Sequence, residues 1–248
     1  MMEGFIEWLC GTSNEASLLR KYIVFKIVPM LNPDGVALGN YRTGLSGKDF
    51  NREYRAPDKA IFPEVYHFKK LVAENKCLFG EKLLMFLDFH GHSTKKNTFM
   101  YGPEFPIVDR FYYEARLFPK LLGNATPMFR YYSCLFKINS FKETTARAII
   151  LRKIGVPLSY TIETSNGSFF DYEKLCDIPY TQQLWKTMGL KIGEALFEYV
   201  DLVLTADRNR YEKITSKKKD KADRKGNSKI TKKSPHKNHE RFSIFSSM

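Results

Sequence analysis

LLMFLDFHGHSTKKNTFMYG, residues 83–102, is the most informative stretch of this chain. Its first seven residues contain one acid, Asp88, and otherwise form an apolar run typical of a strand buried on both faces. The run ends in two imidazoles, His90 and His92, and a second short apolar run follows. Side chains alternate along a strand, so Asp88, His90 and His92 share one side if the strand continues. Because imidazole is the commonest metal ligand and a nearby carboxylate can orient the ring, this end of the strand is a candidate site.

Strand-like and helix-like segments alternate along the rest of the chain. Runs of β-branched and aromatic residues predict strands, and apolar residues at helical spacing predict amphipathic helices. The expected strands are 22–31, 83–89, 97–102, 134–141 and 157–164, and the expected helices are 60–76, 144–155 and 180–204. This alternation predicts an α/β fold with a mixed, mostly parallel twisted sheet covered by helices.

Three polar residues follow predicted strands directly, namely Asn32, His90 and Glu163. In open, mostly parallel sheets, ligands bind beyond the carboxyl ends of the strands. We therefore expect these three side chains to converge on one edge of the sheet.

Positive charge is concentrated near the carboxyl end of the chain. The 248 residues carry a formal net charge of +13, of which about nine lie after residue 206. Residues 208–242 are rich in Lys and have almost no apolar side chains, so they cannot bury enough surface to offset the entropy of ordering. The sequence thus predicts a folded domain over 1–205 and a disordered Lys-rich tail over 206–248. Dense Lys attracts phosphate without reading sequence, but no nucleic-acid module precedes it, so no specific nucleic acid is expected.

Several features indicate a cytoplasmic protein with no membrane partner. No apolar run approaches the ~20 residues of a membrane-spanning helix, and the first residues lack the pattern of a signal peptide. The four cysteines are widely spaced, which is typical of reduced thiols packed in a cytosolic protein.

Several motifs occur in a fixed order: NPDG (32–35), GNYR (39–42), DFNREY (49–54), DFHGHSTKKNTFMYG (88–102) and KETTARAIILRKIGVPLSYTIET (142–164). Together they resemble the M14 metallocarboxypeptidases, specifically the cytosolic carboxypeptidases that shorten glutamate chains on tubulin. The resemblance covers residues 1 to about 200. It implies that 1–205 is the carboxyl-terminal part of a zinc-carboxypeptidase-like catalytic domain, incomplete at its amino terminus. The implied reaction is hydrolysis of a carboxyl-terminal peptide or isopeptide bond with release of glutamate.

The resemblance also implies roles for individual residues. His90 is similar to a zinc ligand, Glu163 to the general base that activates water, and Arg42 to the arginine that polarises the scissile carbonyl. Asn51 and Arg52 resemble the pair that binds the terminal carboxylate of the substrate. Each role suits its chemistry, because a carboxylate can accept a proton and a guanidinium can bind a carboxylate with two parallel bonds. Without the motif set, the same residues would be taken for solvated loop charges and a strand-end acid.

The positions of two further cationic residues can be interpreted in two ways. Lys142 and Arg147 either face an acidic substrate side chain in the pocket or lie as charges on a helix surface. His92 and Asp88 are expected around the metal ligand rather than bound to the metal.

One family feature is missing from the sequence. The family carries its other two zinc ligands in an HxxE motif upstream of the matched segment, and no HxxE occurs in these 248 residues. The family implies one Zn²⁺ per complete site, and with His90 alone the metal is expected to be weakly bound or absent. The chain is then a partial gene model, a truncated paralogue without activity, or a chain completed by ligands from another polypeptide. The first explanation is favoured.

Two functions follow. The first is a zinc metallocarboxypeptidase acting on carboxyl-terminal glutamates of polyglutamylated tubulin, with this chain alone inactive. The alternative is a catalytically inactive carboxypeptidase-like module that binds acidic protein tails. Both imply acidic C-terminal tails, those of tubulin first, as partners, and a cytoplasmic location that extends to microtubules or cilia.

Overall fold

The computed structural model describes residues 1–223 and 242–247. Its centre is a five-stranded sheet in the order β1-β7-β2-β4-β3. The strands are β1 (Ile23–Val28), β7 (Phe242–Ser247), β2 (Leu83–His92), β4 (Leu158–Ser165) and β3 (Thr98–Tyr101). The first four in this order run parallel, and β3 is antiparallel to β4. The predicted α/β fold with a mostly parallel sheet is therefore confirmed.

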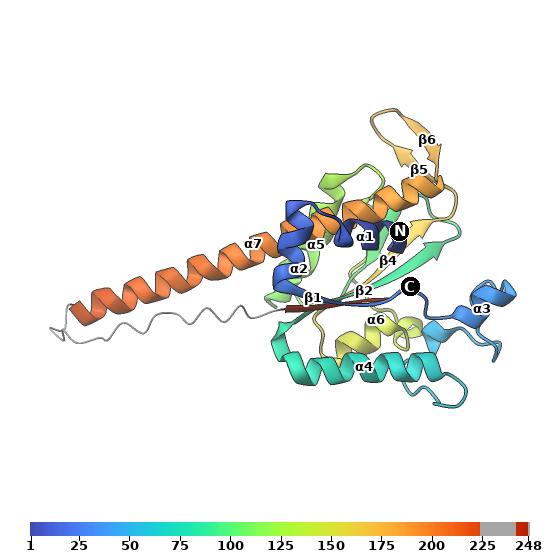
Figure 1. Cartoon of the computed structure of the whole chain (residues 1–248), viewed down its shortest axis with the longest axis horizontal. Helices are drawn as coiled ribbons and strands as arrows, with labels where there is room; N and C mark the ends of the chain where they lie inside the picture. The colour runs from blue at the N-terminus through green and yellow to red at the C-terminus, as the bar shows by residue number, and fades with distance from the viewer. Residues whose placement is uncertain (224–241, 248) are drawn as a thin grey trace.

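Helices cover both faces of the sheet (Figure 1). One face carries α1 (Met2–Cys10), α2 (Asn14–Tyr22), α5 (Phe111–Ala125) and α7 (Gln182–Asp223), and the other carries α4 (Pro63–Phe79) and α6 (Ala146–Ile149). A π-helical turn, η5 (Ile150–Ile154), continues α6. A small hairpin of β5 (Ser168–Asp171) and β6 (Cys176–Pro179) lies apart from the main sheet. The layers bury the sheet on both sides, as a parallel sheet requires.

Side-chain alternation along β2 separates the two cores. Met85, Leu87 and Phe89 belong to the apolar cluster that also contains residues of α1, α5 and α7. Phe86 belongs to the second cluster, beneath α4 and α6. Asp88 lies two residues further along and therefore shares the α4 side of the sheet with Phe86. Asp88 and His90 therefore face the side of the sheet that carries α4 and α6.

Short elements at that edge begin where side chains cap them. The NPDG turn starts α3 (Pro33–Leu38), where the Asn32 side chain accepts a hydrogen bond from the Gly35 amide and Pro33 occupies the first turn. The single-turn helix η1 (Phe50–Arg52) starts in the same way, with the Asp49 carboxylate accepting from the Asn51 amide. These caps fix two loops that the sequence left without regular structure.

The predicted disordered tail differs from the structure at both of its ends. Helix α7 continues past residue 206 to Asp223, and β7 pairs with β1 and β2 inside the sheet. The average composition of 206–248 concealed the FSIFSS segment, whose aromatic and β-branched residues suit a strand once two neighbours can pair with it. Residues 224–241 and 248, which complete the predicted tail, lie outside the described residues.

Other local predictions have mixed outcomes. The helices predicted at 60–76 and 144–155 correspond to α4 and to α6 with η5. The strand predicted over 134–141 is wrong, because only Leu135 forms an isolated bridge, to Tyr101. All four cysteines are free, and three are exposed rather than packed: Cys10, Cys77 and Cys176.

Within residues 1–223, no helix combines the length and the apolar character that a membrane span needs.

The packing of β2 gives the first prediction. Leu87 is completely buried in the core, whereas Leu78, near the end of α4, is 78% exposed. We expect Leu87→Ala to lower the free energy of unfolding by about 2–5 kcal/mol, because it leaves a cavity. The matched Leu78→Ala variant should change it by no more than about 0.5 kcal/mol. Urea denaturation followed by circular dichroism measures both, and equal losses in the two variants would contradict this assignment of the core.

Candidate active site

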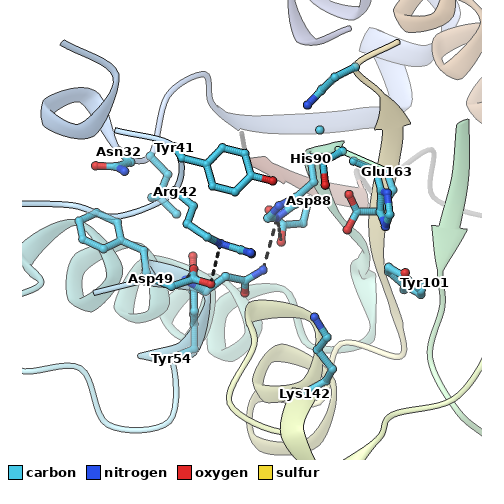
Figure 2. Close-up of a pocket in the computed structure, with 17 residues that line it drawn as sticks. Asn32, Tyr41, Arg42, Asp49, Tyr54, Asp88, His90, Tyr101, Lys142 and Glu163 are labelled. Atoms are coloured by element: carbon cyan, nitrogen blue, oxygen red, sulfur yellow. Dashed lines mark hydrogen bonds and ion pairs between the residues drawn. The ribbon is translucent and has the colours of Figure 1, made fainter. Parts of the chain in front are cut away.

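A cavity of about 480 Å³ opens at the carboxyl ends of β1, β2 and β4. Figure 2 shows Arg42, His90, Lys142 and Glu163 arranged around it. Its lining comprises Leu31, Asn32, Tyr41, Arg42, Asp49, Phe50, Asn51, Tyr54, Asp88, His90, Gly91, His92, Ser93, Tyr101, Lys142, Glu163 and Asn166. The expected meeting of Asn32, His90 and Glu163 at one edge is therefore observed. Arg42, Asn51 and Lys142 join them from segments outside the sheet.

Parallel pairing of β2 with β4 brings the two central residues together. His90 and Glu163 are register partners across this pair. Neighbours in register project to the same face of a sheet, so both side chains enter the cavity. Burial raises the pKa of Glu163, with His90 opposing the effect and Asp88 adding to it. A carboxyl group with a raised pKa is suited to exchanging protons near neutral pH.

Asp88 orients the His90 ring. The Nε2 atom of His90 lies 2.8 Å from Oδ2 of Asp88, whose side chain is only 5% exposed. Burial by itself lowers the pKa of His90, but the charge and hydrogen bond of Asp88 outweigh it and raise the pKa to about 9. Among the described residues, no hydrogen bond engages the other ring nitrogen, Nδ1. In many metal-binding histidines, a carboxylate accepts a hydrogen bond from one ring nitrogen, and the other ring nitrogen binds the metal.

The loop after α3 supplies a guanidinium held by an internal carboxylate. Arg42 Nε lies 3.1 Å from Asp49 Oδ2, and Arg52 approaches the same oxygen at 3.7 Å. Asn51 links this loop to the sheet and to α6. Its Oδ1 accepts a hydrogen bond from the Ala146 amide at 2.8 Å, and its Nδ2 lies 3.5 Å from His90 Nε2. The loop cations and the strand-end residues are thereby joined in one hydrogen-bonded assembly.

Lys142, from the short helix η4 (Ser140–Lys142), adds positive charge to the cavity wall. Burial lowers the pKa of Lys142, and the charges of Arg52 and Arg42 lower it further, while Glu163 and Asp49 oppose this. A bound anion beside the Lys142 ammonium would favour its charged form and so offset the effect of burial.

Two of the predicted substrate-binding residues do not line the cavity. Arg147 is 4% exposed and donates a hydrogen bond to the Gly102 carbonyl, with its guanidinium 5.9 Å from the Tyr101 ring centroid. It therefore matches neither interpretation, pocket-facing or helix-surface, because the start of α6 is buried against β2 and β4. Arg52 turns back on its own loop, where it donates to the Asn51 carbonyl at 2.8 Å.

Several lining residues were not singled out in the sequence. Tyr41, Tyr54 and Tyr101 are the tyrosines of the cavity. Burial, with a contribution from Glu163, raises the pKa of Tyr101, so its hydroxyl stays protonated at neutral pH. No local pattern distinguishes these three among 14 tyrosines. Asp49 did carry a signal, since it stands directly before the FNR segment that it caps.

Comparison with known proteins places this geometry in context. No family model matches the chain. The chain is 41% identical over 203 residues to "Cytosolic carboxypeptidase 2" of Xenopus tropicalis and 37% identical over 203 residues to the human protein of that name. These matches cover 81% of this chain. This chain belongs to the cytosolic carboxypeptidase family. The predicted family is thus confirmed, and its named members are carboxypeptidases, a class of hydrolase.

Solved structures agree with this family assignment. A metallo-carboxypeptidase from Burkholderia cenocepacia superimposes with a TM-score of 0.67 at 25% identity, over 81% of this chain and 52% of that one. The matched segment covers only 20% of the Xenopus protein and 22% of the human one. The chain thus spans about a fifth of the length of these cytosolic carboxypeptidases.

The metal that the names of these structures imply does not fit the side chains present. Within residues 1–223 and 242–247, no group of three or more His, Cys, Asp or Glu side chains could hold a metal ion. His90 offers one free ring nitrogen, and Asp88 is bound to the other one. A zinc site in a hydrolase needs three protein ligands, and the described residues do not bring three together.

The His90–Asp88 pair gives the second prediction. In the chain without metal, NMR titration should give a His90 midpoint of about 9. His92 should titrate below 6.5, because burial and then Lys95 and Lys142 lower its pKa. Because the His90 pKa is raised on folding, its stabilising contribution is complete below about pH 6.5 and is lost as pH rises through 9.

The control for this titration is Asp88→Asn. Removing the charge leaves burial, which lowers the His90 pKa, opposed only by the charges of Glu163 and Asp49, so the His90 midpoint should fall clearly below 9. A His90 midpoint that is unchanged in this variant would contradict the pairing.

Proposed function

We propose that this chain forms part of a zinc metallocarboxypeptidase that removes carboxyl-terminal glutamates, with polyglutamylated tubulin tails as the substrate. One observation carries the proposal. A half-buried carboxyl group with a raised pKa, Glu163, shares a cavity with His90 and with the two cations Arg42 and Lys142. This combination provides a proton acceptor, a ligand and charges that attract an anion.

Glu163 is the proposed general base. In its ionised form it takes a proton from an attacking water and can later return that proton to the leaving amine. Burial raises its pKa, which makes it a stronger base than an exposed carboxylate and suits it to both transfers. Arg42 is the proposed stabiliser of the negative charge that develops on the scissile carbonyl oxygen.

Asn51 and Arg42 are the proposed anchors for the substrate's terminal carboxylate. Asn51 is held by the Ala146 amide, so its Nδ2 is fixed in the cavity as a donor. Arg52 is predicted from the sequence to bind the same carboxylate. In the proposal it acts indirectly, because it pairs with Asp49, which also pairs with Arg42. An exopeptidase must recognise a chain end, and a guanidinium with a neighbouring amide binds the two oxygens of a carboxylate.

Lys142 is the proposed determinant for an acidic side chain. Its amine lines the cavity in a region where neighbouring cations already lower its pKa. A glutamate carboxylate could pair with this ammonium, whereas an apolar or basic side chain could not. Arg147 has no such role in the proposal, because it is buried against Gly102.

Zinc enters this proposal through the family alone. One Zn²⁺ belongs to a complete site, and the 248-residue chain is expected to hold it weakly because His90 is its single suitable imidazole at the cavity. The names of the relatives support a cytoplasmic location. An association with microtubules or cilia follows from the proposed tubulin substrate.

The activity is tested on a form extended at its amino terminus by any coding sequence that precedes residue 1 in frame. With zinc and a polyglutamate-tailed peptide, we expect release of glutamate, measured by mass spectrometry. Glu163→Gln should reduce the rate about 10²–10⁴-fold, because it removes the general base. The rate should increase as pH rises through the raised pKa of Glu163. Release that is unaffected by Glu163→Gln would refute the assigned role.

The incomplete ligand set favours a second candidate function. The chain would then be a catalytically inactive carboxypeptidase-like module that binds acidic protein tails through Arg42, Asn51 and Lys142. The preceding genomic sequence separates the two candidates, since an in-frame HxxE supports the enzyme and a stop codon supports the module.

Binding of acidic tails is expected of the 248-residue chain under either candidate. A peptide ending in several glutamates with a free carboxylate should bind, and the same peptide amidated at its end should bind about 10-fold or more weakly. Lys142→Ala should weaken binding, whereas Lys96→Ala should not, because Lys96 pairs with Asp177 outside the cavity. Isothermal titration calorimetry measures each affinity. Equal affinity for the free and amidated peptides would exclude recognition of a chain end.

A further inference from the structure

The β3 side of the cavity carries a lysine that has no part in the proposed reaction. Lys95 belongs to the segment between β2 and β3. Its Nζ lies 4.8 Å from the ring centroid of Phe99 and 5.9 Å from that of Tyr101, which lines the cavity. An ammonium group is attracted to the face of an aromatic ring, so these two rings hold the positive charge at the rim of the cavity.

The two rings lie on the face of the sheet that carries Glu163. Phe99 is the register partner of Glu163 across the antiparallel pair of β3 and β4, and it is completely buried. Its ring packs edge-on against the rings of His92 and Tyr101, with centroid distances of 5.3 and 5.5 Å. Register partners project to the same face, so Lys95 covers the sheet surface directly beside Glu163.

Lys95 and its neighbour Lys96 differ in the partners of their charges. The Nζ atom of Lys96 lies 2.6 Å from Oδ2 of Asp177 on β6, so its charge is paired. Lys95 is exposed, and it forms no ion pair with a carboxylate of the residues that the structure describes. Its charge is therefore available to an anion from solution. Because the rings already hold the ammonium in place, binding an anion there costs less entropy.

The order of the strands places this charge on a defined side of the cavity. His90, Glu163 and Phe99 form one row across β2, β4 and β3, with neighbouring strands about 4.8 Å apart. Lys95, above Phe99, therefore lies on the far side of Glu163 from His90. Figure 2 shows Arg42 on one side of Glu163 and β3 on the other. A peptide with its terminal carboxylate at Arg42 and its scissile bond at Glu163 thus continues toward Lys95.

We propose that Lys95 binds the acidic side chain of the residue that precedes the scissile bond, so that the site recognises two successive glutamates. This inference rests on the proposed function, which assigns the released glutamate to Arg42, Asn51 and Lys142. A carboxylate at the preceding position can pair with the Lys95 ammonium, whereas an apolar side chain cannot. The site therefore prefers a chain of glutamates to a single glutamate that follows a neutral residue.

The experiment uses the complete 248-residue chain and isothermal titration calorimetry at low salt. The probes are two peptides with free carboxyl ends, Gly-Gly-Glu-Glu and Gly-Gly-Ala-Glu. The first should bind about 2–5-fold more tightly, because the second lacks one exposed ion pair. This preference should shrink at high salt, because salt screens exposed charges. Lys95→Ala should bind both peptides equally, whereas Lys95→Arg should keep the preference, since a guanidinium also stacks on aromatic rings.

The matched control is Lys96→Ala, which removes the adjacent positive charge. It should keep the preference, because Lys96 is already paired with Asp177. An equal loss of preference in Lys96→Ala would show that net charge alone is responsible, and it overturns the inference.

The remaining outcomes separate this inference from the proposed function. If Lys95→Ala weakens binding of both peptides by the same factor, the lysine only covers Phe99, and the inference is overturned. Equal affinity of the unmodified chain for the two peptides, with its preference for a free over an amidated chain end intact, overturns the inference and leaves the proposed function standing. Failure of the unmodified chain to bind either peptide overturns both.

Discussion

The candidate site depends on the hydrogen-bonded register between β2 and β4. This register sets His90 opposite Glu163, although the two residues are far apart in the chain. A slip of one residue would turn one of the two side chains to the opposite face, into the core beneath α1 and α7. The slip is opposed by buried residues on both faces, with Leu87 and Tyr160 on one and Phe86 on the other. Packing of the strands therefore maintains the separation of the two functional groups.

The cations of the cavity are positioned before any ligand arrives. Asp49 caps η1 and holds the guanidiniums of Arg42 and Arg52. Asn51 is fixed by the Ala146 amide at the start of α6. Side chains that are already ordered lose less entropy on binding, so this arrangement favours tight recognition of an anion. Asp49 is thus as important to the proposed site as the cations, although it has the wrong charge to bind a carboxylate.

The position of β7 links the stability of the sheet to the geometry of the site. The strand pairs with β2 as far as Asp88, two residues before His90. Because β7 pairs with both β1 and β2, it fixes the distance between these two strands, and so it also helps to position His90 at the end of β2.

The sequence by itself determined the type of fold, the family and most of the strand-end residues. Apolar periodicity located β1, β2, β4 and most of the helices, because burial on both faces leaves a strong local pattern. The ordered motifs identified Arg42, Asn51, His90 and Glu163, which do share one cavity. Only the tertiary structure placed Arg147 in the interior, turned Arg52 toward its own loop and selected Tyr101 among the tyrosines. It also put FSIFSS into the sheet from a segment whose average composition predicts disorder. Burial and pairing of these residues depend on neighbours that are distant in the chain, and no local pattern in the sequence records them.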